Sequence, residues 1–291
     1  MDIKDKYNYK SNTSGAIVWG ASWPGGLYLA INFGLSFVLV FLLIFWIIIN
    51  RSNEFEPGFI VEKVIQWSIP LTLAIQVITT VIYAIFYKKA VKECLPVVKQ
   101  KTNWSMGIWS ILLMLGVSSI SSYILDFIQR FIPDFGSSYD SIVESMFSTA
   151  LPLTVLSTVI MAPLCEELMM RGLTFNRLLS GVKKWPAILI SAAIFGFIHL
   201  NLLQGLNAFV LGVVLAFTYY KTRSLLICML QHGANNLLSV IGSYLVINEI
   251  GNYTLINNCL SVGFIVLGLI SAYFFFKTKD VEIEKNSFVR Q

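Results

Sequence analysis

Long apolar runs separated by short polar segments make up most of the chain. A helix that crosses a membrane needs about 20 consecutive apolar residues, and eight segments are interpreted as such spans. They cover residues 27–49, 64–87, 104–125, 146–180, 187–200, 201–220, 225–246 and 254–276. Residues 201–207 are either a polar turn or the start of the sixth helix. The pattern predicts an all-α fold, a polytopic membrane helical bundle with about eight transmembrane helices.

Composition supports a membrane location. Hydrophobic residues make up 56% of the 291 residues and charged residues 13%, whereas a soluble domain carries about 25% charged residues. Four cysteines without a C-x-x-C pair indicate reduced, packed thiols rather than a disulfide framework. We expect a multi-pass protein of the cell membrane. The frequent Lys, Ile and Asn residues are typical of a low-GC bacterium, which favours a bacterial plasma membrane.

The basic residues are distributed asymmetrically among the connecting segments. Threading eight spans with the N-terminus inside places all 21 Lys and Arg residues on the inner side except Arg51, Lys63 and Arg130. Because cytoplasmic loops carry the excess of Lys and Arg, both termini are expected to be cytoplasmic. The net charge of +5 then lies mostly on the cytoplasmic side, where anionic lipid head groups attract it. The expected partner is therefore the lipid bilayer and not nucleic acid.

One apolar run contains three charges within six positions. Glu166, Glu167 and Arg171 lie in the segment from Met161 to Gly172, and each charge at the membrane centre costs roughly 2.5–3.5 kcal/mol on insertion scales. Glu167 and Arg171 are spaced i,i+4 and can pair on one helix face. Glu166 lies about 100° around the helix from Glu167 and has no such partner. An unpaired intramembrane carboxylate indicates a functional site.

The two histidines of the chain both fall in apolar segments. The helices over 146–180 and 187–200 are expected to form an antiparallel hairpin around Lys183. Glu166 precedes that residue by 17 positions and His199 follows it by 16. Since both helices rise equally per residue, the carboxylate and the imidazole should lie at a similar depth.

Two i,i+4 pairs extend this polar set. Phe195 and His199 share one helix face, and His232 and Asn236 share a face of the seventh span. Asn235 is offset from that face and is expected to form a hydrogen bond between helices. The sequence therefore predicts one free carboxylate, two imidazoles and one carboxamide together at membrane depth.

These groups are sufficient for hydrolysis of a peptide bond. A carboxylate can take a proton from water while a neighbouring imidazole orients that water, and an imidazole and an amide on one helix face can donate to an oxyanion. The alternative is a divalent metal such as zinc, with Glu166, His199 and His232 as candidate ligands. The sequence contains no H-E-x-x-H helix, G-x-S-x-G elbow, Walker A loop or G-x-G-x-x-G fingerprint.

Three motifs, each on an apolar helix, resemble in order those of the CPBP intramembrane proteases: Glu166-Glu167-x-x-x-Arg171, Phe195-x-x-x-His199 and His232-x-x-x-Asn236. This family, formerly called Abi, includes type II CAAX prenyl endopeptidases and bacteriocin-processing or self-immunity proteins. The resemblance runs from residue 161 to about residue 238. The first half of the chain resembles only generic membrane helices.

The resemblance implies a role for each motif residue. Glu166 would activate water, His199 would position the same water, and His232 with Asn236 would hold the oxyanion. The other motif residues would have supporting roles: Glu167, Arg171 and Phe195. The family has been described both as metalloproteases and as metal-independent glutamate proteases. No fourth metal ligand is evident, so the glutamate mechanism, which requires no cofactor, is favoured.

The resemblance also organises the chain and its expected function. We expect a polar N-terminal segment, three N-terminal transmembrane helices, a catalytic helical core and a charged cytoplasmic tail, over residues 1–24, 25–145, 146–277 and 278–291. The expected activity is intramembrane endopeptidase action on a membrane-associated peptide or protein, in CAAX-type processing, in bacteriocin or signal-peptide maturation, or in self-immunity. A non-catalytic membrane scaffold or regulator of a sensor or transporter is the alternative. A proton-coupled carrier is less favoured, because inverted repeats are absent.

Overall fold

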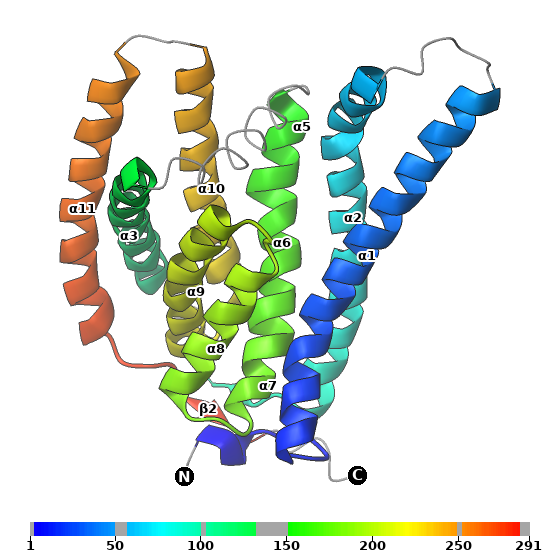
Figure 1. Ribbon diagram of the computed structural model, residues 1–291. Coiled ribbons are helices and arrows are strands. Elements are labelled where there is room, and N and C mark those ends of the chain that lie inside the picture. The colour runs from blue at the N-terminus through cyan, green and yellow to red at the C-terminus, as the bar shows by residue number, and fades with distance from the viewer. Residues whose placement is uncertain (1–2, 50–56, 100–102, 132–150, 249–251, 286–291) are drawn as a thin grey trace.

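The computed structural model describes residues 3–49, 57–99, 103–131, 151–248 and 252–285. It shows a bundle of helices with two short strands (Figure 1). The elements are η1 (Ile3–Lys6), α1 (Ser14–Ile49), α2 (Pro57–Glu93), β1 (Val97–Val98), α3 (Trp104–Phe131), α5 (Leu151–Val155), η2 (Leu156–Met161), α6 (Ala162–Glu167), η3 (Leu168–Phe175), α7 (Asn176–Leu179), α8 (Lys184–Phe197), α9 (Leu202–Thr222), α10 (Leu225–Ile247), α11 (Tyr253–Lys277) and β2 (Ile283–Glu284). The expected start of the fourth span, at residue 146, lies outside the described residues.

Seven helices of the described part of the chain are long and apolar enough to cross a membrane. The prediction of a polytopic membrane helical bundle is therefore confirmed. The fourth span is one continuous helical stretch, Leu151–Leu179, built from α5, η2, α6, η3 and α7.

The predicted fifth span, α8, is shorter than a membrane crossing. It has 14 residues, which correspond to about 21 Å of helix, against a hydrocarbon core of about 30 Å. The helix ends because the chain turns at Leu200, whose φ of 55° is left-handed. Asn201 then caps α9, because its side chain accepts a hydrogen bond from the Gln204 N–H. Residues 202–207 thus form the start of α9 and not a separate turn.

The first helix begins at Ser14, well before the apolar run starts at residue 27. Packing holds this polar part helical, because Ala21 is buried and its carbonyl accepts a hydrogen bond of 3.0 Å from the Thr174 hydroxyl. The boundary predicted at residue 24 consequently falls inside α1.

The two described ends of the chain lie at the same end of the bundle, which we call the terminus end (Figure 1). There β1 pairs antiparallel with β2, and the ammonium group of Lys6 donates to the Ile283 carbonyl at 2.9 Å. This arrangement agrees with the expectation that both termini lie on one side of the membrane.

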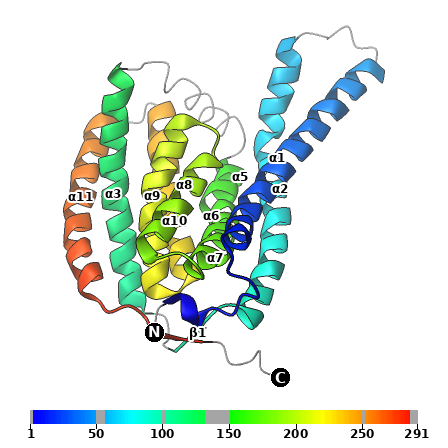
Figure 2. The same ribbon diagram turned by 60° about the horizontal axis from the view of Figure 1, so that its bottom comes forward.

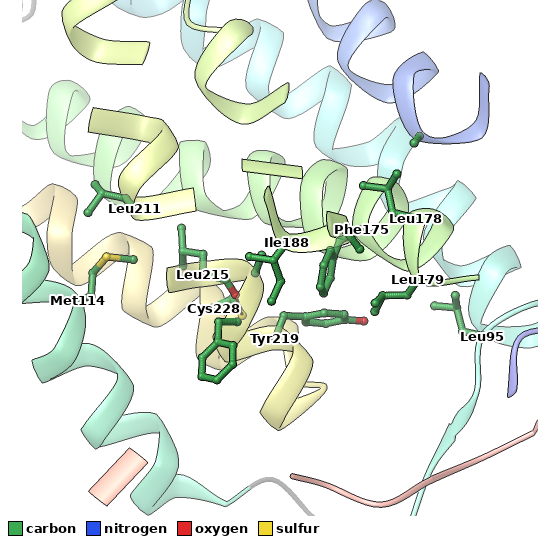
Figure 3. Close-up of a cluster of buried hydrophobic side chains, with 14 of the residues drawn as sticks. Leu95, Met114, Phe175, Leu178, Leu179, Ile188, Leu211, Leu215, Tyr219 and Cys228 are labelled. Carbon is green, nitrogen blue, oxygen red and sulfur yellow. Dashed lines mark hydrogen bonds between the residues drawn. The ribbon is translucent and has the colours of Figure 1, made fainter. Parts of the chain in front are cut away.

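A buried apolar cluster fills the bundle toward the terminus end (Figure 3). Phe175, Leu179, Ile188, Leu215 and Tyr219 belong to it, and each is at most 3% exposed. At the opposite end α1 and α2 stand apart from the other helices, as Figure 2 shows. The helices are therefore packed most densely near the terminus end.

Candidate active site

The sequence-predicted site residues line one cavity of about 760 Å³. Glu166 reaches it from α6, His199 from the turn between α8 and α9, and His232 and Asn236 from α10. Phe195 of α8 also forms part of the wall. The structure thus brings together the carboxylate, the two imidazoles and the carboxamide that the motif spacing predicted to converge.

Glu167 and Arg171 form the ion pair expected from their spacing. The Arg171 Nη1 atom donates to Glu167 Oε1 at 3.1 Å, and both side chains are 0% exposed. The Arg171 Nη2 atom donates to the Gly212 carbonyl at 3.0 Å, and its guanidinium carbon lies 4.9 Å from the centre of the Phe195 ring. A charge removed from such a pair leaves its partner buried and uncompensated. The pair therefore fixes the glutamate-bearing helix against α8 and α9.

His232 lies between the two adjacent carboxylates. Its Nδ1 atom is 2.9 Å from Glu167 Oε1, and Nδ1 is the donor because a carboxylate only accepts. Its Nε2 atom lies 3.8 Å from Glu166 Oε2, which is too long for a direct hydrogen bond. Glu167 thus accepts hydrogen bonds from Arg171 and His232, whereas the Glu166 carboxylate lines the cavity.

His199 is held by the backbone of its own helix. Its Nδ1 atom lies 2.7 Å from the Phe195 carbonyl oxygen, so Nδ1 carries the hydrogen and Nε2 of the neutral ring is an acceptor. The Phe195 ring meets the His199 ring edge-on at 5.0 Å and the His232 ring edge-on at 5.9 Å between centres. One aromatic side chain therefore orients both imidazoles.

The helix that carries the glutamates departs from α-geometry on both sides of them. Its segments Leu156–Met161 and Leu168–Phe175 are π-helical, and α6 lies between them. Such π-segments inside α-helices occur frequently at functional sites, because they shift side chains relative to a regular helix.

The first π-segment exposes a backbone acceptor to α10. The Ala162 N–H bonds to the Ser157 carbonyl, and Pro163 has no N–H. Neither residue therefore donates to the Thr158 carbonyl, which instead accepts a hydrogen bond of 2.9 Å from Asn236 Nδ2. This contact fixes the Asn236 carboxamide and leaves its second N–H for another acceptor.

Asn235 does not form the bond between helices that the sequence suggested. Its Nδ2 atom donates at 3.4 Å to Asn236 Oδ1 on the same helix. Its Oδ1 atom is buried without a hydrogen-bond partner, although the side chain lines the cavity. The expected hydrogen bond between helices was therefore wrong.

The alternative metal site is not assembled in the described part of the chain. There, no three His, Cys, Asp or Glu side chains are grouped as metal ligands, and this includes the candidates Glu166, His199 and His232.

Sequence reasoning missed the contribution of α1 and α2 to the cavity. Tyr28, Asn32 and Ser36 of α1 line it, together with Thr72 and Gln76 of α2. The sequence does indicate a polar face on α1, because these three residues recur at i, i+4 and i+8 and so occupy one side of the helix. They were missed because these helices were interpreted as generic membrane spans.

The fold and the cavity define a class of protein: a polytopic membrane protein that holds a carboxylate, two imidazoles and a carboxamide around an internal cavity. Residues 148–238 match the family described as type II CAAX prenyl endopeptidase Rce1-like. All motif residues lie within that segment, so the predicted family resemblance is confirmed over this part of the chain.

A curated relative is named as a membrane peptidase. The chain is 32% identical over 92 residues to a Bacillus subtilis (strain 168) protein named "Putative membrane peptidase YdiL". The aligned segment is 32% of this chain and covers 38% of that relative. No solved structure matches the chain.

Proposed function

We propose that this protein is an intramembrane endopeptidase that hydrolyses a peptide bond in a membrane-associated peptide or protein. The observation that carries the proposal is that two adjacent carboxylates have different surroundings. Glu167 is fully buried in an ion pair, whereas Glu166 lines the cavity beside two imidazoles. The similarity to a type II CAAX prenyl endopeptidase family and to a protein named as a membrane peptidase supports the same activity.

The geometry suggests how these residues divide the reaction. Glu166 takes a proton from a water molecule, and Nε2 of His199 accepts the second O–H of that water and so orients it. The oxygen attacks the carbonyl carbon of the scissile bond and gives a tetrahedral oxyanion. Glu166 then returns the proton to the amide nitrogen, the C–N bond breaks, and the products are a carboxylic acid and an amine.

The oxyanion is stabilised from α10. The free N–H of Asn236 donates to it, as does Nε2–H of His232 in its imidazolium form, because Nδ1 of that ring is already committed to Glu167. The candidate substrates are those that the motif resemblance implies: a CAAX-type protein, a bacteriocin or signal peptide, or a self-immunity target.

The test compares cells that carry the wild-type protein with cells that carry Glu166→Gln at matched expression. Peptide termini from membranes and medium are read by mass spectrometry. Specific termini are expected to vanish in Glu166→Gln and to persist in Glu93→Gln, a control on the exposed end of α2. Identical termini in all three strains would contradict the proposal and favour a non-catalytic scaffold.

A further inference from the structure

The cavity extends from the candidate catalytic residues away from the terminus end. On α10 its lining begins at His232, seven residues after the helix starts at Leu225, and continues to Ser243, four residues before the helix ends at Ile247. This stretch of 12 residues corresponds to about 16 Å along the helix. Ser239, within it, is exposed. The cavity therefore reaches toward the end of the bundle opposite the termini.

Packed side chains close the other direction. Between the cavity and the terminus end lie Arg171, Phe175, Leu179 and Ile188, all 0% exposed, and Tyr219 at 3%. Figure 3 shows the last four together in the buried cluster. Because a close-packed core leaves few voids as large as a water molecule, these described side chains block the direct route from the candidate catalytic residues to the terminus end.

The described residues of the cavity wall are a mixture of apolar and polar side chains, of which few are charged. Of the described residues that line it, Glu166 is the only Asp, Glu, Lys or Arg. Amides and hydroxyls dominate its extension on α10 and α1: Asn235, Asn236, Ser239, Ser243, Asn32 and Ser36. Asn235 is 4% exposed, and its Oδ1 atom has no hydrogen-bond partner. A buried acceptor without a donor costs free energy. A bound molecule that donates a hydrogen bond to Asn235 Oδ1 would remove this cost.

We propose that this extension of the cavity binds an extended, uncharged peptide segment, which enters from the membrane side opposite the termini. The proposal deepens the proposed function and rests on it for the cleavage of that segment. A chain in extended form rises about 3.4 Å per residue, so the 16 Å stretch accommodates about five residues beside the scissile bond.

The polar wall favours a peptide over a lipid chain. An extended segment in a membrane has free N–H and C=O groups, each costing several kcal/mol if unsatisfied, and the wall amides and hydroxyls can pair with them. A lipid acyl chain would leave the buried Asn235 Oδ1 atom without a donor. The described residues of the extension on α10 and α1 include no Asp, Glu, Lys or Arg that could pair with a charged peptide side chain, so lysine within the bound segment should be excluded.

The direction of access can be tested by labelling engineered cysteines. Ser239→Cys is placed in a background with Cys94→Ala and Cys259→Ala, because these two thiols are half-buried and exposed, while Cys165 and Cys228 are buried. A membrane-impermeant maleimide is added to either side of vesicles, and an epitope tag at the C-terminus reports which side carries the termini. We expect labelling from the opposite side alone.

A matched control lies on the same helix at nearly the same depth. Leu237 is 41% exposed but does not line the cavity, so Leu237→Cys should face lipid and stay unlabelled. The inference is overturned if Ser239→Cys reacts from the terminus side, from both sides or from neither, or if it reacts no faster than Leu237→Cys.

The occupant is tested by protection in a protein that cannot cleave it. Glu166→Gln is combined with Ser239→Cys, and labelling is timed with a pool of synthetic uncharged hexapeptides or a matched pool in which one residue is lysine. The uncharged pool should slow labelling at least threefold, and the lysine pool should not. Asn235→Leu should abolish the protection. Equal protection by both pools, or protection by neither, would overturn the inference.

These outcomes separate the two proposals. Cysteine labelling and its protection by peptides need no catalysis. If both give the expected results but no peptide termini depend on Glu166, only the proposed protease function fails. If termini do depend on Glu166 but Ser239→Cys reacts from the terminus side, the protease proposal stands and the peptide-binding inference fails.

Discussion

At the scale of single residues, the site depends on a division of labour between two neighbouring glutamates. Glu167 is bonded to Arg171 and to His232, whereas Glu166 lines the cavity. Two adjacent positions of one helix point about 100° apart, so one carboxylate can serve the structure while the other serves chemistry. The two should therefore respond very differently to the same substitution.

Substitution of each glutamate by glutamine tests this division. Glu167→Gln leaves the buried Arg171 charge uncompensated and should lower the unfolding free energy by about 3–5 kcal/mol. Glu166→Gln should change it by less than about 1 kcal/mol, because the carboxylate lines the cavity and its 3.8 Å contact with His232 Nε2 is too long for a hydrogen bond. Thermal unfolding in detergent measures both variants. Equal destabilisation by the two substitutions would show that Glu166 also has a structural role.

Residue spacing predicted part of this site and could not predict the rest. The i,i+4 spacing of Glu167 and Arg171 correctly indicated an ion pair. The position of His232 between both carboxylates depends on how α10 packs on α6, which no local pattern encodes. Asn235 was assigned to bonding between helices, and the close approach of α10 to the π-segment places it in the cavity wall instead.

At the scale of elements, the contact between α10 and the first π-segment positions the side chains that are proposed to bind the oxyanion. The Thr158 carbonyl is free because Pro163 lacks an N–H, and Asn236 binds it. Gly233 permits this approach, because any Cβ there would lie 2.8 Å from the Val159 carbonyl.

A pair of glycine substitutions on α10 tests this contact. Gly233→Ala should push α10 from the π-segment, lower the unfolding free energy by about 1–3 kcal/mol as overpacked sites do, and reduce cleavage. Gly242→Ala is the matched control, since a Cβ there has no atom within 4 Å. It should be neutral or stabilise by up to about 1 kcal/mol, because alanine is the better helix former. Unfolding curves and cleavage rates that are the same for both variants would contradict the account.

The ends of elements show where sequence patterns stop being informative. The apolar run over 187–200 predicted a span, but α8 ends at Phe197 because the left-handed Leu200 and the cap at Asn201 redirect the chain. The shorter helix places His199 in the turn beside the cavity. Hydropathy alone does not distinguish a membrane span from a shorter apolar helix that ends inside the bundle.

At the scale of the whole molecule, the N-terminal segment ties the terminus end together. The Tyr7 hydroxyl donates to Asn176 Oδ1 at 3.0 Å and accepts from Arg223 Nη1 at 2.8 Å. Burial raises the pKa of Tyr7 above its usual value, while the nearby Arg223 lowers it to a smaller extent. The hydroxyl therefore stays neutral and can donate to Asn176, on the helix that also carries the glutamates.

Removal of that hydroxyl should loosen the whole bundle. Tyr7→Phe leaves Asn176 and Arg223 each without one partner, which costs about 1–3 kcal/mol for buried groups. Tyr9→Phe is the matched control, because Tyr9 meets Arg177 through its ring face at 4.4 Å and phenylalanine keeps that face. Melting temperature in detergent should fall clearly in Tyr7→Phe and little in Tyr9→Phe. A similar fall in both would contradict a role for the hydroxyl.

The overall arrangement was largely accessible from the sequence. Apolar run length predicted the helical membrane fold, and the placement of Lys and Arg anticipated both termini at one end. The cavity was not accessible in the same way. Its wall combines α1 and α2 with helices far along the chain, and only tertiary packing shows that Asn32 and Gln76 share a space with Glu166.

The central claim is that Glu166 activates water for peptide-bond hydrolysis. The most direct measurement uses purified protein in lipid vesicles, a library of synthetic peptides and H₂¹⁸O, with products read by mass spectrometry. The account predicts new C-terminal carboxylates that carry ¹⁸O with the wild type and none with Glu166→Gln of equal stability. Absence of new termini with the wild type, or equal amounts with both proteins, would contradict it.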